Sequence, residues 1–592
     1  MTNTHTFHIP VMGIGFTIDT PLKVAPYGIS SVISLVDDIL MERLREYYSQ
    51  KEGLPFTEIP YNSPDRRSRR ITAYLDLIKE LTEKRFSELK NNKKDTLRYL
   101  DMLPAGPEAT SEWQSQDDMA LDSDILKMGS IDVNIMTKLD RIHFKDGEML
   151  PSEENDAHTA LRGFAESKLC SSVVFSAGMN PSLYNYISQF DDFYPDANGH
   201  FKKKITLKIS DYRSAIIQGK FLAKKGLWVS EYRVESGLNC GGHAFATQGY
   251  LMGPILAEIR DNREELQKTI FEIFATALEQ RNRPVPSKIP AVRISAQGGV
   301  GTAEEHRFLM DHYKVDSVGW GSPFLLVPEA TNADEDTLQQ LADAKEEDLY
   351  LSNISPLGVP FNNLRNNSKD VEKNIRIVQG KPGSTCPKRY MVFSVEDAEH
   401  GHCPASREYQ TAKLEELNAK GLSEELYKIE REKIIEKACI CVGLGTAALL
   451  INKMETKVEG TGVSVCPGPN MAYFSQKMTL EEITGHIYGR NNVISRIDRP
   501  HMFIKELESY IEFLKAKVLE VRENLTSKQA RWLQSFVINM QEGTEYYIQL
   551  FNGLKESFRE MKQNTLKQLE EFKAELQRIH GSIEELAAIG IR

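Results

Sequence analysis

The stretch "VESGLNCGGHAFATQGY" (residues 234–250) places a cysteine, two glycines and a histidine together after an apolar run. A thiol and an imidazole are zinc ligands, a thiolate is a nucleophile, and an imidazole can act as a base near neutral pH. The residue types allow all three kinds of site. Zinc at Cys240 and His243 lacks two further ligands nearby, and no neighbouring pattern supports Cys240 as a nucleophile. His243 is then either a base beside a cofactor or a hydrogen-bonded loop histidine, and residues further along the chain decide between them.

Two later segments, "ISAQGGVGT" (294–302) and "VDSVGWGSPFL" (315–325), run from apolar residues into glycines. Glycine allows the backbone to approach an anion closely and to turn its N–H groups toward it. The two segments are the last two strands of an eight-strand pattern, where barrels commonly bind phosphate. The sequence therefore predicts a phosphate site at Gly298, Gly299, Gly319, Gly321 and Ser322.

The elements that position these residues alternate between short apolar runs and helix-compatible stretches, which is typical of a parallel sheet. The runs are rich in Val and Ile, as expected for strands buried on both faces. Eight repeats predict an α/β fold, a (β/α)₈ TIM barrel over residues 1–370, with a helical insertion at 37–128 that we expect to cover the mouth of the site. The eight strand segments are 7–16, 29–36, 129–136, 170–179, 203–210, 226–236, 291–301 and 314–326.

Beyond the barrel, residues 371–480 form a Cys-rich accessory segment and residues 481–592 a mainly α C-terminal region of long amphipathic helices. These helices pack either on the barrel or on a second copy of the chain, so a homo-oligomer is one expectation. Soft thiolates suit zinc or an iron–sulfur cluster, yet the spacing lacks a pair of Cys-x-x-Cys motifs, so buried free thiols and a metal centre both stay open. No metal site is predicted at the clustered cysteines, Cys386, Cys403, Cys439, Cys441 and Cys466.

Composition narrows the class of protein. A net charge of −11 and a pI near 5.8 argue against nucleic acid as a partner. No run approaches the roughly 18 apolar residues of a membrane span, and the N-terminus lacks the pattern of a signal peptide. Seven cysteines in such a chain indicate reduced thiols. We therefore expect a cytoplasmic protein with no membrane partner.

Several of these segments resemble the FMN-dependent nitronate monooxygenase family, also called 2-nitropropane dioxygenase-like. "VESGLNCGGH", the segment from "ISAQGGVGT" to "VGWGSPFLLVPEA", and "SPLGVPFNNLRN" follow in the family's order and spacing. "IPVMGIGF" resembles its first FMN-contacting strand and "DVNIMT" its third. The match covers about 8–36 and 129–367. Departures are Asn239-Cys240 before the Gly-Gly-His motif, Gly321-Ser322-Pro323 and Val11-Met12-Gly13, which put the substrate in more doubt than FMN.

The resemblance implies an FMN cofactor. It places the phosphate on the glycine pairs, Asn134 and Lys208 near the ring or ribityl chain, and His243 at the flavin as the catalytic base, approached through Gly241 and Gly242. Asn134 and Lys208 are equally interpretable as ordinary barrel-end residues. The cofactor-binding residues so predicted are Met12, Gly13, Asn134, Lys208, Gly241, Gly242, Gly298, Gly299, Gly319, Gly321 and Ser322.

The leading functional hypothesis is an FMN-dependent oxidoreductase of the nitronate monooxygenase-like group that oxidises a small carbon acid or nitronate. A first alternative is a flavin-dependent enoyl-thioester reductase of fatty acid or polyketide synthesis, which would add an acyl carrier protein as a partner. A second is a non-catalytic barrel that serves as an interaction scaffold. A phosphosugar or nucleotide enzyme with the same phosphate site is a third.

Overall fold

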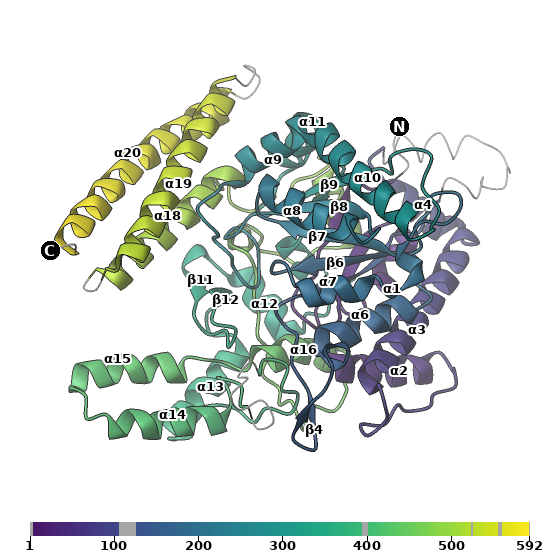
Figure 1. Cartoon of the computed structure of the whole chain (residues 1–592), viewed down its shortest axis with the longest axis horizontal. Coiled ribbons are helices and arrows are strands. Elements are labelled where there is room, and N and C mark those ends of the chain that lie inside the picture. Colours follow the sequence, from purple (N-terminus) through teal and green to yellow (C-terminus); the bar gives the residue numbers. More distant parts are fainter. Residues whose placement is uncertain (1–3, 106–125, 393–400, 523–524, 554–558, 591–592) are drawn as a thin grey trace.

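Eight parallel strands form a closed barrel at the centre of the computed structural model, which describes residues 4–105, 126–392, 401–522, 525–553 and 559–590 (Figure 1). Each strand lies within a segment predicted from the sequence, and the predicted (β/α)₈ fold class is confirmed. Around the barrel the order is β1-β10-β9-β8-β7-β6-β3-β2. The strands are β1 (Phe7–Ile9), β2 (Ser30–Ser34), β3 (Ile131–Met136), β6 (Ser172–Ser176), β7 (Lys204–Ile209), β8 (Val229–Glu235), β9 (Arg293–Gln297) and β10 (Ser317–Gly319).

The interior of the barrel is polar, which corrects the expectation of strands that are apolar on both faces. Alternate residues of a strand point to opposite faces. On β8, Tyr232 packs outward near Gly219, whereas Glu231 and Arg233 are buried and paired, with Arg233 Nη2 2.7 Å from Glu231 Oε1. Ser295 Oγ on β9 donates to Glu231 at 2.6 Å. Burial opposes the charge on Glu231, but Arg233 nevertheless lowers its pKa to about 2, so the interior charges are neutralised in place.

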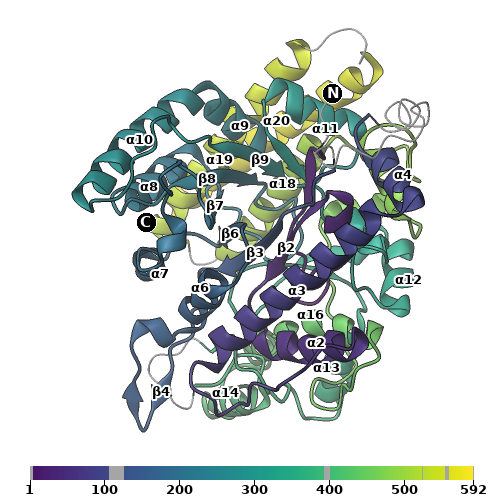
Figure 2. The ribbon, with the colours of Figure 1, turned by 90° about the vertical axis from the view of Figure 1, so that its right-hand side faces the viewer.

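Helices surround the barrel, and one of them comes from the region predicted as an insertion. α3 packs beside α6, in the ring position that follows β2 (Figure 2). Residues 37–128 thus supply a barrel helix as well as α2 (Asp38–Lys51) and α4 (Lys93–Met102); residues 106–125 lie outside the described residues. The ring helices are α1 (Thr20–Val24), α3 (Arg66–Lys90), α6 (Asp156–Glu166), α7 (Pro181–Ile187), α8 (Tyr212–Ala223), α9 (Met252–Asp261), α10 (Arg263–Gln280), α11 (Ala303–His312) and α12 (Glu335–Asp343).

The accessory segment is built into the barrel end. α16 begins at Cys439 as N-cap, is buried over most of its length, and meets the loop after β1, where Gly15 N donates to Leu444 O at 2.8 Å. A hairpin of β11 and β12 precedes it. The elements here are β11 (Leu349–Ser352), β12 (Phe361–Leu364), α13 (Ser368–Val378), α14 (Arg407–Ala419), α15 (Glu424–Ile435), α16 (Ile440–Ile451) and α17 (Leu480–Ile487). Short elements are β4 (Phe144–Lys145), β5 (Glu148–Met149), η1 (Ala25–Tyr27), η2 (Ser152–Glu154), η3 (Asp191–Phe193), η4 (Ser322–Leu326), η5 (Glu346–Asp348) and η6 (Pro469–Tyr473).

Three long helices at the C-terminus lie side by side on one flank of the barrel (Figure 1). They are α18 (Met502–Val521), α19 (Ser527–Gly553) and α20 (Arg559–Gly590). α20 buries Leu569, Leu576 and Ile583, and α19 also contacts α9 of the ring. Their apolar faces therefore pack within the chain. Among the described residues, no single helix has the length and apolar character to cross a membrane, and only the bent pair α15–α16 could by length and composition.

Candidate functional site

Two adjoining cavities lie at the carboxyl ends of the strands, where barrel active sites form. The first, the cradle cavity, measures about 100 Å³ and is lined by the glycine loops after β9 and β10. The second, the His243 cavity, measures about 160 Å³ and is lined by His243, Asn134 and Lys208. Every site residue predicted from the sequence lines one or both. The residues common to both are Val11, Gly13, Glu235, Gly241, Gly242 and Cys466.

The cradle cavity has the chemistry of an anion site. Gly298 and Gly299 adopt left-handed φ values of 138° and 74°, which only glycine adopts without strain. Their backbone N–H groups donate to no acceptor in the part of the chain that the structure describes. Gly321 and Ser322 begin η4 across the cavity. Unpaired N–H groups beside a helix start are suited to a phosphate.

The same cavity holds an unpaired acceptor. Asn239 Oδ1 is buried without a hydrogen-bond partner among the described residues, whereas Gln297 Oε1 has the imidazole of His8 as its partner. A buried polar atom without a partner is costly, so Asn239 Oδ1 is available to accept from a ligand. FMN offers both a phosphate for the glycine N–H groups and a ring N–H group for this acceptor. Each cavity is smaller than the roughly 300–1,000 Å³ of most small-molecule sites, so a flavin requires the two to open into one.

His243 is held by two neighbours. Its Nε2 lies 2.7 Å from Ser355 Oγ, and its ring meets Phe361 edge-on at 5.0 Å. Burial, together with the positive charge of Lys138, lowers the pKa of His243 to about 4. The sequence expectation of an imidazole that titrates near pH 6.5 therefore needs correction. His243 is neutral at pH 7 and is a weak base.

A charged group that sequence reasoning missed lies at the end of β8. Glu235 Oε1 accepts from Lys208 Nζ at 2.9 Å and also from the side-chain amide of Gln297. These three residues end β7, β8 and β9, and Glu235 lines both cavities. Their position just before the loops was the signal available in the sequence. The site therefore contains an ion pair beside the glycine cradle.

Asn134 and Cys240 lie in the walls. Asn134 Nδ2 donates to Val174 O at 3.1 Å, so its amide is partly used within the barrel. The thiol of Cys240 donates to Gln297 O at 3.6 Å, and burial raises its pKa well above the ordinary value. A thiol that stays protonated is a poor nucleophile. Asn134 lines the His243 cavity and Cys240 lines the cradle cavity.

The site is closed by residues 464–470, here called the cover segment. Gly242 N donates to Cys466 O at 3.1 Å, and Gly468 N donates to Ser322 Oγ at 2.8 Å. A Cβ on Gly241 would lie 2.5 Å from Cys466 O, so the cover segment leaves no room for a side chain at this position. No described residue of 37–128 lines either cavity, which corrects the expectation that this region covers the site.

Four of the five clustered cysteines meet beside the His243 cavity, which Cys441 lines. The sulfur of Cys386 accepts hydrogen bonds from the thiols of Cys403 and Cys439, and these bonds lower its pKa. Cys439 also contacts Cys441. Cys466 lies apart, in the cover segment. Among the described residues, no three His, Cys, Asp or Glu side chains are placed to hold a metal ion.

Comparisons with known proteins leave the family open. No protein-family model and no curated protein matches the chain. One similar solved structure is the enoyl reductase domain of MlnA from the macrolactin biosynthesis cluster of Bacillus amyloliquefaciens. It shares 13% sequence identity at a TM-score of 0.36, over 82% of this chain and 93% of that one. Similarity this low carries no argument about function, which therefore depends on the site.

Proposed function

We propose that the protein is an FMN-dependent oxidoreductase acting on a small anionic carbon acid, with nitronates as the class to test. The observation that carries the proposal is the glycine cradle. Gly298 and Gly299 present unpaired N–H groups in the same cavity as the unpaired acceptor of Asn239. This combination suits a ligand that offers both a phosphate and a hydrogen-bonding ring.

The chain's own residues divide between the two ends of such a ligand. Gly298, Gly299, Gly321 and Ser322 would hold the phosphate. The remaining residues around the ring would be Met12, Gly13, Gly241, Gly242 and Gly319. When bound, FMN supplies two-electron oxidation of the substrate, while the protein binds, orients and excludes water.

The His243 cavity favours a substrate that is already an anion. Lys138 supplies a positive charge that acts on His243, whereas Lys208 is already paired with Glu235. Neutral His243 can orient an oxygen of the substrate without first releasing a proton. A base with a pKa near 4 removes protons poorly from weakly acidic carbons. A nitronate needs little further proton removal, which is why this class comes first.

The first experiment is a visible spectrum of purified protein from 300 to 700 nm, recorded before and after denaturation. FMN is added to the native protein if it is colourless. We expect flavin absorption bands, and we expect the chromophore released on denaturation to be FMN.

The site variant is Gly242→Ala. Gly242 has φ 76° and lines both cavities, and its new Cβ would project into open space there. Gly421→Ala is the matched control, since Gly421 has φ 60° and open space in the turn between α14 and α15.

Both alanines carry the same backbone strain of about 1 kcal/mol. Only Gly242→Ala should weaken FMN binding, by at least about tenfold, which corresponds to about 1.4 kcal/mol. A colourless protein that does not take up FMN would refute the proposal. With flavin bound, oxygen uptake on alkyl nitronates supports the nitronate class, whereas rapid bleaching by NADPH supports the enoyl-thioester reductase instead.

A further inference from the structure

A cleft of about 300 Å³, separate from the two cavities above, lies beside the carboxyl ends of β2 and β3. It concentrates positive charge. It is lined by the first turn of α3, the loop after β3 and Lys388 from the accessory segment. In a chain with a net charge of −11, such a concentration is unusual. The cations that matter here are Arg66, Arg67, Arg70, Arg141, Lys145 and Lys388.

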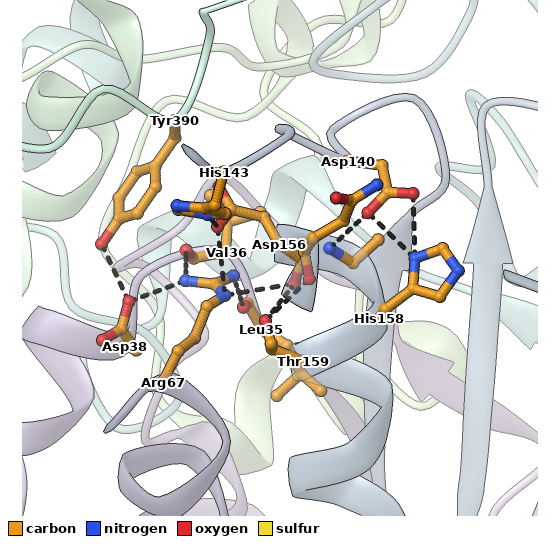
Figure 3. A network of polar contacts seen from close by, with 12 residues as sticks. Leu35, Val36, Asp38, Arg67, Asp140, His143, Asp156, His158, Thr159 and Tyr390 are labelled. Atoms are coloured by element: carbon orange, nitrogen blue, oxygen red, sulfur yellow. Dashed lines mark hydrogen bonds and ion pairs between the residues drawn. The ribbon is translucent and has the colours of Figure 1, made fainter. Parts of the chain in front are cut away.

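The carboxylates in this cleft already have partners. Asp38 accepts from Arg67 Nη1 at 2.7 Å and Arg70 Nη1 at 3.1 Å, and Asp156 Oδ1 lies 2.8 Å from His143 Nε2 (Figure 3). Figure 3 shows Arg67 between the two aspartates. These acids therefore leave little negative charge for the other cations of the cleft.

Three cations remain without a carboxylate partner within ion-pair distance among the described residues. They are Arg66, which stacks on Tyr61 at 4.1 Å, Arg141 and Lys145. The Nε of Arg141 is buried and has no hydrogen-bond partner. An unpaired guanidinium nitrogen in a cleft is a strong donor for a phosphate oxygen. The cleft thus presents donors that nothing in the described chain satisfies.

The start of α3 strengthens this positive field. The helix begins "RRSRR", its first turn contains no acidic residue, and the side chain of its N-cap residue Asp65 does not cap the helix. Asp65 has φ 49° and instead pairs with Arg162 at 2.6 Å. A helix N-terminus is already positive, so arginines there repel it unless an anion is bound.

The cleft adjoins the candidate site through one side chain. Tyr390 lines both the cleft and the His243 cavity, and its hydroxyl donates to Asp37 Oδ1 at 3.0 Å. Tyr390 is therefore a wall that the cleft and the His243 cavity share.

We propose that this cleft binds the phosphate group of a phosphate-ester substrate whose reactive end enters the His243 cavity past Tyr390. Phosphate binding is inferred from the cleft alone, whereas entry of the reactive end into the His243 cavity rests on the proposed function. A phosphate fits better than a carboxylate because it presents more acceptor oxygens to cations that arrive from separate segments.

The test is titration calorimetry of the full chain, with FMN added, using inorganic pyrophosphate as the probe. Arg141→Gln and Lys145→Gln should each weaken pyrophosphate binding at least about tenfold. Lys145 is exposed on β4, so its variant is not expected to disturb folding. Lys224→Gln is the control, because Lys224 is an exposed lysine far along the chain on α8's C-cap.

Unchanged affinity in Arg141→Gln and Lys145→Gln would overturn the proposal, as would binding abolished by Gly242→Ala, which would place the anion in the cradle instead. Pyrophosphate binding does not require flavin, so a colourless protein that still binds it through Lys145 would refute the proposed function alone. With flavin bound, Lys145→Gln should raise KM for a phosphate-bearing substrate and leave KM for a small nitronate unchanged.

Discussion

The imidazole of His243 packs against Phe361 and contacts Ser355, and this enclosure decides how it can act. Because burial lowers its pKa to about 4, the ring is neutral across the physiological range. Its role is then to orient an anion through a hydrogen bond. That role differs from the proton removal expected of an exposed histidine.

We predict that His243 contributes no inflection to the pH–rate profile between pH 6 and 8 and that the reaction is lost only as pH falls toward 4. In protein labelled with ¹³C-histidine, the ring resonance of His243 is identified by its absence in His243→Gln. This resonance should titrate with a midpoint well below pH 6. A midpoint near 6.5 would contradict the prediction and restore His243 as a general base.

The predicted glycines of the loops after β9 and β10 line one cavity, because their types and spacing are local, and their role in holding a cofactor stays a prediction. The sequence missed Glu235 and Gln297, which become a site only when neighbouring strands bring them together with Lys208. It also gave no sign that Gly241 contacts Cys466, which lies more than 200 positions away. Contacts of that kind leave no local pattern.

Among the elements, α18 carries a buried carboxylate that helps to attach it to the barrel. Glu506 Oε1 accepts from Ser236 Oγ at 2.6 Å, Met252 N donates to both its oxygens, and Tyr547 OH donates to Oε2 at 2.8 Å. This single side chain ties α18 to the loop after β8, the start of α9, and α19.

We predict that Glu506→Ala lowers the free energy of unfolding by about 3 kcal/mol, because three donors lose their acceptor, and that Glu506→Gln lowers it by about 1 kcal/mol. Glu512→Gln, on the exposed side of α18, should change it by less than about 0.5 kcal/mol. Urea unfolding followed by circular dichroism measures these differences.

The effect of Glu506→Gln should also depend on pH. Burial raises the pKa of Glu506 to about 7, above its unfolded value, so its ionisation destabilises the fold as pH rises from about 4.5 through 7. Glutamine does not ionise, and the deficit of the variant should therefore shrink between pH 5 and pH 8. A deficit that grows over this range would show that Glu506 is charged in the folded protein.

The eight strands were predictable because each is a short apolar run bounded by turns, and alternation with helices fixes a parallel barrel. The ring position of α3 was not, since helical periodicity alone does not say which helix packs beside which. The polar interior was also hidden, because Glu231 and Arg233 look like exposed residues of an edge strand until the barrel closes.

For the whole molecule, several enclosed histidines make acid a destabilising condition. Burial lowers their pKa values, to about 4 for four and further for His8, so each binds a proton more readily when the chain unfolds. Stability should fall with decreasing pH from about 6.5 toward 4, by up to about 1.4 kcal/mol per histidine for each pH unit. The histidines are His5, His8, His243, His306 and His501.

We therefore predict a lower Tm at pH 5 than at pH 7, measured by differential scanning calorimetry at constant ionic strength. Glu506 acts in the opposite direction over this range, but it is a single carboxyl against the five histidines. Proton uptake on unfolding at pH 5, obtained from buffers of different ionisation enthalpy, is the accompanying measurement. A Tm that rises between pH 7 and pH 5 would be inconsistent with neutral, enclosed histidines.

The cover segment also sets the order of events on the ribosome. The last barrel strand ends at Gly319, whereas Cys466 and Asn470, which close the cradle cavity, emerge about 150 residues later. At about 5–20 residues per second, this gap lasts roughly 7–30 s. During that interval the nascent chain exposes the glycine loops without their cover. We expect a ligand of the cradle to load during translation and to exchange slowly from the finished protein.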